Sequence, residues 1–161
     1  MSDSESAARI LVVNDEAVIR EIIVSILTSA GYQCAIASDG IEALAVLDSG
    51  QEFELLLSNF MMPNLDGIGL LERTRERFPD MAFVLESGMQ DGSVFSAAIE
   101  KGAYDYLQIP FTRETLLAVI CRALGHRRLV LENRRYQASL ESLVATRTEQ
   151  LKNATINLER S

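Results

Sequence analysis

The chain has 161 residues, of which 48% are hydrophobic, and it carries a formal net charge of −8 at pH 7. This length is enough for one well-buried domain plus an appendage, but not for a second complete domain. The acidity argues against a nucleic-acid backbone or an anionic membrane surface as the main partner, because both require a basic patch.

Short apolar runs alternate with longer segments of helical periodicity, a pattern typical of β-α units around a parallel sheet. Five strands are predicted, at residues 10–13, 33–37, 55–58, 82–85 and 104–107. Each is followed by a predicted helix, at about 16–29, 41–47, 66 onwards, 91–101 and 112–160. Gly31 and Gly102 are expected to end the first and fourth helices, and Asp39 and Thr112 to cap the second and fifth.

The last predicted helix is far longer than a domain of this size requires. Between Thr112 and Arg160 there is no proline, and the one glycine is Gly125. At 1.5 Å per residue, a continuous helix of this length would measure about 70 Å. Its apolar positions step by three and four residues with one stutter, which predicts a coiled-coil seam. The seam comprises Leu129, Asn133, Tyr136, Leu140, Val144, Arg147, Leu151, Ala154 and Leu158.

We expect this seam to form a parallel homodimer, in which Asn133 and Arg147 weaken the apolar contact but can fix the register. The alternative is a single amphipathic helix that folds back on the domain or frays in solution. The predicted organisation is a disordered N-terminus at 1–8, a globular domain at 9–124 and a coiled-coil helix at 125–161.

In an open parallel sheet, ligands bind beyond the carboxyl ends of the strands. The candidate site residues at these positions are Asn14, Asp15, Asn59, Ser87 and Ile109.

Glu86 interrupts the fourth apolar run. By alternation its side chain should point away from Ser87, and we expect it to reach solvent or a cation.

Three strings carry a family resemblance: ILVVNDEAVIRE, NFMMPNLDG and GAYDYLQIPF. In this order and spacing they resemble the receiver domains of two-component response regulators, over residues 9 to 124. The resemblance implies a flavodoxin-like, doubly wound sheet of five parallel strands in the order 2-1-3-4-5. It also implies that Tyr106 occupies the position of a rotameric switch aromatic, although a buried strand tyrosine would be equally ordinary there.

In that family an acidic pair and an aspartate hold Mg²⁺, a histidine kinase phosphorylates the aspartate, and a hydroxyl and a lysine engage the phosphoryl group. By position, Asn14 and Asp15 fall on the acidic pair, Asn59 on the phosphoacceptor, Ser87 on the hydroxyl and Ile109 on the lysine. Only Asp15 and Ser87 retain the chemistry that the family uses at these positions.

These departures affect every requirement of phosphoryl transfer, which needs an anionic nucleophile, a cation and preorganised positive charge. Asn59 offers a neutral amide, and Ile109 supplies no cation. Asp15 alone is a marginal Mg²⁺ site, so we expect weak or absent Mg²⁺ binding and no other cofactor. Three interpretations stay open: a decayed scaffold, a fixed or ligand-set signalling conformation, and residual phosphorylation.

The tail ENRRYQASLESLVATRTEQLKNATINLERS resembles the linker helices that join receivers to output domains, notably HD-GYP phosphodiesterases but also histidine-kinase-like or cyclase domains. We therefore expect the chain to be part of a longer regulator whose output domain is absent here. A stand-alone adaptor that docks a partner protein through the surface around Tyr106 is the alternative. No HD pair, Cys-His pair or Gly-rich phosphate loop indicates an enzyme.

The sequence also indicates a cytoplasmic location. Cys34 and Cys121 lie far apart without a CxxC pattern, as expected for reduced core residues. No apolar run is long enough to span a membrane, and the polar, acidic N-terminus is unlike a signal peptide.

Overall fold

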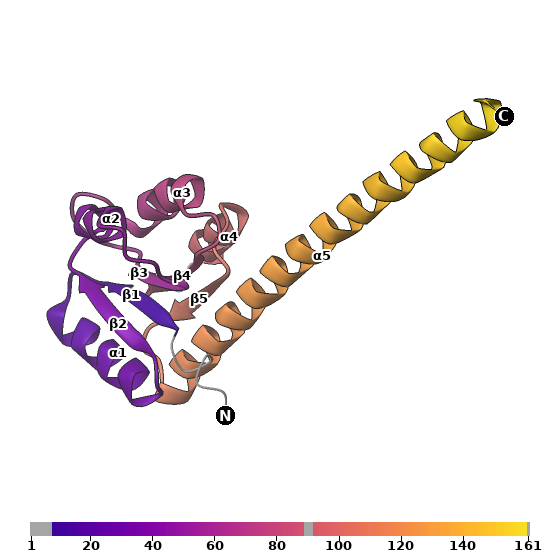
Figure 1. Ribbon diagram of the computed structural model, residues 1–161. Helices are drawn as coiled ribbons and strands as arrows, with labels where there is room; N and C mark the ends of the chain where they lie inside the picture. Colours follow the sequence, from indigo (N-terminus) through magenta and orange to yellow (C-terminus); the bar gives the residue numbers. More distant parts are fainter. Residues whose placement is uncertain (1–7, 89–91, 161) are drawn as a thin grey trace. The chain divides into compact units, whose positions relative to one another are not determined.

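The structure, a computed structural model, describes residues 8–88 and 92–160 (Figure 1). The expectation for residues 1–8 falls outside these ranges except at Ala8. Within them, the strands are β1 (Arg9–Val13), β2 (Gln33–Ala37), β3 (Leu55–Asn59), β4 (Ala82–Ser87) and β5 (Asp105–Gln108). The helices are α1 (Ala17–Ser29), α2 (Gly40–Asp48), α3 (Gly67–Arg77), α4 (Gly92–Glu100) and α5 (Arg113–Arg160).

The strands form one parallel sheet in the order β2-β1-β3-β4-β5, which confirms the predicted fold class. Each predicted strand lies within one or two residues of the observed one, because the buried runs end at polar or turn-forming residues. Parallel pairing brings all five carboxyl ends to one edge. In the register, Val13 pairs with Ser58, and Asn59 pairs with Glu86.

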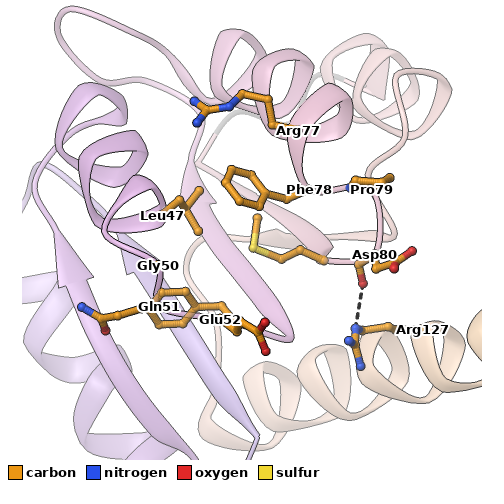
Figure 2. Close-up of a pocket in the computed structure, with 11 residues that line it drawn as sticks. Leu47, Gly50, Gln51, Glu52, Arg77, Phe78, Pro79, Asp80 and Arg127 are labelled. Atoms are coloured by element: carbon orange, nitrogen blue, oxygen red, sulfur yellow. Dashed lines mark hydrogen bonds between the residues drawn. The ribbon is translucent and has the colours of Figure 1, made fainter.

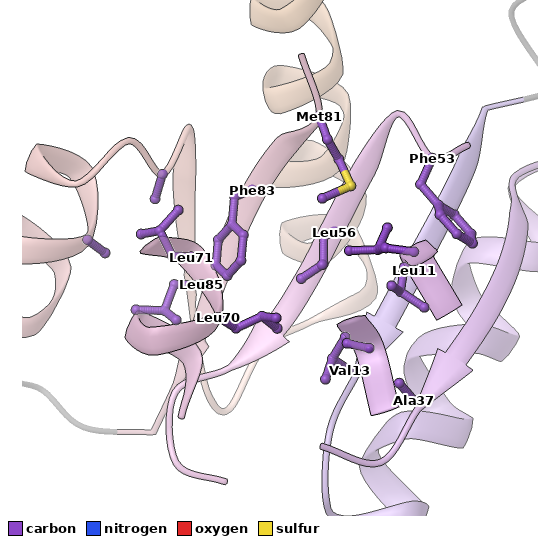
Figure 3. Packing of buried hydrophobic residues seen from close by; sticks show 14 residues of the cluster. Leu11, Val13, Ala37, Phe53, Leu56, Leu70, Leu71, Met81, Phe83 and Leu85 are labelled. Atoms are coloured by element: carbon purple, nitrogen blue, oxygen red, sulfur yellow. The ribbon is translucent and has the colours of Figure 1, made fainter. Parts of the chain in front are cut away.

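Two helical layers bury the two faces of the sheet, and alternation decides which strand residues meet which layer. One face, which includes Leu11, Val13 and Phe83, packs in the cluster of Figure 3 with residues of α2, α3 and α4. The opposite face includes Ile10, Val12 and Val84 and packs against α1 and the first turns of α5. A side chain at the end of a strand therefore continues one of two buried rows.

The start of α3 lies close against the end of β3. A Cβ built on Gly67 would lie 2.5 Å from the backbone oxygen of Asn59, far inside normal contact distance. Asp66 caps the helix, since its Oδ1 accepts from the backbone N–H of Gly69 at 2.7 Å. Glycine at 67 thus allows the helix to begin directly beside the strand-end residues.

Helix α5 is continuous from Arg113 to Arg160, and Thr112 caps it, with Oγ1 accepting from the N–H of Thr115 at 3.1 Å. The chain divides into two compact units, Met1–Arg127 and Arg128–Ser161. In the second unit the described apolar side chains with large exposed areas are Leu129, Tyr136, Leu140, Leu143, Val144, Leu151, Ile156 and Leu158. None of the helices in the described ranges has the length and apolar character needed to cross a membrane.

Candidate functional site

The five sequence-predicted site residues lie at the carboxyl edge of the sheet, after β1, at the ends of β3 and β4, and after β5. Four of them form two hydrogen-bonded pairs, and the fifth, Asn14, pairs with a residue outside this set. Asn59 bonds to Asp15 through their side chains, whereas Ile109 bonds to Ser87 through the backbone, its N–H donating to the Ser87 carbonyl at 2.9 Å. Asn14 pairs with Glu86, which the sequence analysis did not place in the site.

The amide of Asn59 bridges two loops. Its Nδ2 donates to Oδ1 of Asp15 at 3.2 Å and to the carbonyl oxygen of Met61 at 3.1 Å. Asp15 follows β1 and Met61 follows β3, so one amide group links the two loops that flank the strand ends. An NH₂ group is a donor only. The Asp15 and Met61 oxygens that converge here therefore each accept one hydrogen bond from it.

Asn14 is fully buried, and its side-chain amide is used at both ends. Nδ2 donates to Oε1 of Glu86 at 3.0 Å, and Oδ1 accepts from the backbone N–H of Glu16 at 2.9 Å. Its main chain is held too, because Arg20 Nη1 donates to the Asn14 carbonyl at 2.7 Å. These contacts fix the β1-α1 turn against the end of β4.

Glu86 corrects the sequence-based expectation that its side chain would reach solvent or a cation. Its exposed fraction is 0%. The side chain does point away from Ser87, as alternation requires, but it continues the buried row of Ala82 and Val84 rather than leaving the protein. Glu86, one residue before the end of β4, still lies under the layer formed by α1 and α5. The sequence does not show how far that layer extends over the sheet.

The environment of Glu86 disfavours its charged form. Burial raises its pKa from 4.5 to about 7, the hydrogen bond from Asn14 opposes this shift, and the charges of Glu16 and Asp15 add to it. Oε2 is buried and has no hydrogen-bond partner among the described residues. In the sequence, Glu86 stands out as a single acidic residue inside an apolar strand. This pattern is as compatible with a buried, hydrogen-bonded side chain as with an exposed one.

The donor set does not fit Mg²⁺. This ion takes oxygen ligands, usually one or two carboxylates with water. Among residues 8–88 and 92–160, no group of three or more His, Cys, Asp or Glu side chains could hold a metal ion. Asp15 Oδ1 and the Met61 carbonyl oxygen each accept a hydrogen bond from the Asn59 NH₂ group, and that group supplies no oxygen ligand.

Tyr106 lies on β5, away from these contacts, and is not a buried strand tyrosine. Its exposed fraction is 42%, and its ring stacks on Phe95 with centroids 4.2 Å apart and planes at 15°. A cavity of about 430 Å³ beside the pair is lined by Gly92, Phe95, Tyr106 and Gln108. The switch role implied by the family resemblance remains a prediction.

A separate cavity of about 500 Å³ lies near the amino ends of β3 and β4 (Figure 2). Its lining includes Leu47, Phe53, Phe78 and Met81, and Arg127 Nε donates to the carbonyl of Asp80 at 2.7 Å. None of the predicted site residues lines it, because they all lie at the opposite edge of the sheet.

Comparisons with known proteins agree on one family. The sequence profile of the response regulator receiver domain matches residues 10–121. A putative NtrX-like response regulator of Rickettsia bellii is 34% identical over 153 residues, covering 93% of this chain and 31% of the relative. The chain thus spans about a third of that protein.

Solved structures show the same similarity. The structure of NtrX from Brucella abortus matches with a TM-score of 0.78 and 32% identity, over 81% of this chain and 30% of that one. The signal receiver domain of an HD domain-containing protein from Pseudomonas fluorescens matches with a TM-score of 0.71 and 31% identity, over 76% of this chain and 98% of that one.

Proposed function

We propose that this chain, which belongs to the response regulator receiver domain family, regulates an output domain without being phosphorylated. Receiver domains are generally signalling modules rather than catalysts, and we assign no enzymatic activity to this one. The observation that carries the proposal is the Asn59 amide, which links Asp15 to the Met61 carbonyl at the position where the family resemblance expects a phosphoacceptor carboxylate.

Phosphoryl transfer to a side chain requires an anionic oxygen and nearby positive charge. Asn59 supplies a neutral amide whose NH₂ group is already bonded, and Ile109 supplies a branched apolar side chain where the resemblance expects a lysine. The hydrogen bonds of Asn59 replace the link that a metal would make between the two loops. This arrangement supports a fixed signalling conformation in a metal-free site.

Transmission would run through α5. Its exposed apolar side chains include Leu129, Tyr136, Leu140 and Leu151, and their spacing fits a parallel coiled coil with a second copy of the chain. Pairing is favourable because it removes this apolar surface from water. The matched relative is longer than this chain, which supports the proposal that an output domain belongs to the native protein. We expect such a regulator to act in the cytoplasm.

The second candidate function is a protein-binding adaptor. The half-exposed Tyr106, whose ring stacks on the buried Phe95 beside a cavity, favours it, because an exposed tyrosine held in place by packing is a common anchor for a partner. Deletion of α5 beyond Arg127 separates the two functions. It should abolish signalling through a coiled coil and leave binding by the receiver surface intact.

The direct test is labelling with acetyl phosphate and Mg²⁺, followed by intact mass measurement. A receiver domain with an aspartate at the phosphoacceptor position, treated in parallel, serves as the positive control. We expect that control to gain the mass of one phosphoryl group and this chain to gain none. Phosphorylation of the unmodified chain would overturn the proposal.

A further inference from the structure

The Asn14–Glu86 contact connects residues that belong to two non-adjacent strands. Glu86 ends the buried row of β4, and Asn14 follows β1, with β3 between them in the sheet. The Glu86 side chain therefore crosses above the end of β3, where Asn59 lies, to reach the Asn14 amide at 3.0 Å. Both side chains have exposed fractions of 0%, so no solvent can take the place of either partner.

This geometry restricts position 14 to a hydrogen-bond donor. Glu86 Oε1 accepts from Nδ2 of Asn14, and Oε2 has no partner among the described residues. A carboxylate at position 14 would put two buried acids about 3 Å apart in place of the amide donor. Two carboxylates at such a distance cannot both stay ionised and share one proton instead.

We propose that Glu86 is the specificity-determining residue of this strand-end site: it favours an amide at position 14 and so denies the site a carboxylate ligand for a divalent cation at that position. The inference rests on the proposed function, which it deepens by naming the residue that maintains the metal-free state. Glu86 is a positioning residue, because it acts through Asn14. Burial raises the pKa of Glu86 to about 7, so a second buried acid beside it would leave one of the two protonated.

If Glu86 disfavours a carboxylate at position 14, restoring the three family residues is not enough to restore phosphorylation. The triple variant Asn14→Asp/Asn59→Asp/Ile109→Lys returns each charge that the family resemblance expects. In the labelling reaction, the carboxylate introduced by Asn59→Asp attacks the phosphorus of acetyl phosphate. A new O–P bond forms, the bond from phosphorus to the acetyl oxygen breaks, and acetate leaves with that electron pair. The acid introduced at position 14 would still share its proton with Glu86.

Adding Glu86→Gln reverses the pair. The introduced aspartate at 14 becomes the acceptor, the introduced amide at 86 becomes the donor, and the buried hydrogen bond is kept at the same chain length. The quadruple variant therefore tests the charge of Glu86 and not its size. A matched control adds Glu16→Gln to the triple variant, which removes one negative charge from an exposed neighbour of the same site.

The experiment measures phosphoryl incorporation by intact mass and Mg²⁺ affinity by titration. We expect the quadruple variant to be labelled at least ten-fold faster than the triple variant and to bind Mg²⁺ at least ten-fold more tightly. The Glu16→Gln control should behave as the triple variant does. Equal labelling of the triple and quadruple variants, whether both high or both absent, would overturn the inference.

Folding is followed separately, because a buried pair of acids can unfold the domain. Asn14→Asp alone should lower the Tm, and Asn14→Asp/Glu86→Gln should recover most of the loss. A single variant as stable as the natural chain would contradict the inference. Labelling of the natural chain would instead overturn the proposed function, so the two failures are distinguishable.

Discussion

The side-chain amide of Asn59 donates a hydrogen bond to the carboxylate of Asp15 over 3.2 Å, across two loops that are 44 residues apart in the chain. Asn59→Asp would remove this donor and place two acids together. We expect it to destabilise the metal-free protein by up to about 1 kcal/mol, the usual scale for a solvent-exposed polar or charged pair. Millimolar Mg²⁺ should restore part of the lost Tm, since the two carboxylates can then share a cation.

Asn59→Ala is the control for this prediction, because it removes the donor and adds no charge. Its Tm should be insensitive to Mg²⁺. An Asn59→Asp variant as stable as the natural chain in the presence of EDTA would show that the amide bridge contributes little.

The natural chain should not respond to Mg²⁺ or to beryllofluoride. Both depend on carboxylates that Asn14 and Asn59 do not supply, and the Asn59 NH₂ group donates to Asp15 and to the Met61 carbonyl instead of offering an oxygen ligand. Amide chemical-shift titration checks this at residues near the strand ends. Saturable shifts around Asp15 and Asn59 at sub-millimolar Mg²⁺ would contradict the expectation.

Stability should fall as the pH rises from about 4.5 to 7. The folded state holds a proton on Glu86 up to a pKa of about 7, whereas the unfolded chain loses it near 4.5, so the native state binds more protons in this window. The free energy of unfolding should decrease across it by an amount of order 2–3 kcal/mol, from about 1.4 kcal/mol per pKa unit. Asp15 and Glu16 are the facing acids.

Urea denaturation at a series of pH values in EDTA checks this dependence, with Glu86→Gln as the matched variant. The difference in stability between the two proteins should change with pH over this window and be flat above it. A constant difference from pH 4.5 to 7 would mean that Glu86 titrates normally.

The apolar stripe of α5 should produce a dimer. Leu140→Glu places a charge on the predicted seam, whereas Ala138→Glu places the same charge about 200° around the helix. Losing one buried leucine in each chain costs about 2 kcal/mol per chain, so Leu140→Glu should weaken the dimer by a hundred-fold or more. Light scattering over a concentration series measures this. A monomeric natural chain, unchanged by truncation after residue 125, would exclude the coiled coil.

The start of α3 should not tolerate a side chain. Gly67→Ala would bring a Cβ within 2.5 Å of the Asn59 carbonyl and 2.7 Å of Leu85 Cδ1, so either the helix or the strand end must shift. We expect a loss of about 1–3 kcal/mol by thermal or urea unfolding. Gly125→Ala is the control, because nothing lies within 4 Å of its built Cβ. That helical substitution should be neutral or stabilising by up to about 1 kcal/mol.

The sequence by itself determined the succession of strands and helices, because burial imposes a period of two or 3.6 residues on the side chains. It also indicated where the strands end, because the apolar runs stop there. Parallel pairing then places all of these ends at one edge of the sheet. Asn59 and Ile109 were therefore identifiable as residues at the carboxyl edge of the sheet from chain position alone, and Gly31 was correctly expected to end α1, where its φ is +100°.

Only the tertiary structure decided which side chains meet at that edge. Alternation predicted the direction of Glu86, but whether that direction led to solvent depended on how far α1 and α5 cover the sheet. Its partner, Asn14, lies 72 residues away in sequence and one strand removed in the sheet. No local pattern encodes such a contact, because it is fixed by the register of β1, β3 and β4 and by the burial of Glu86 under the helical layer.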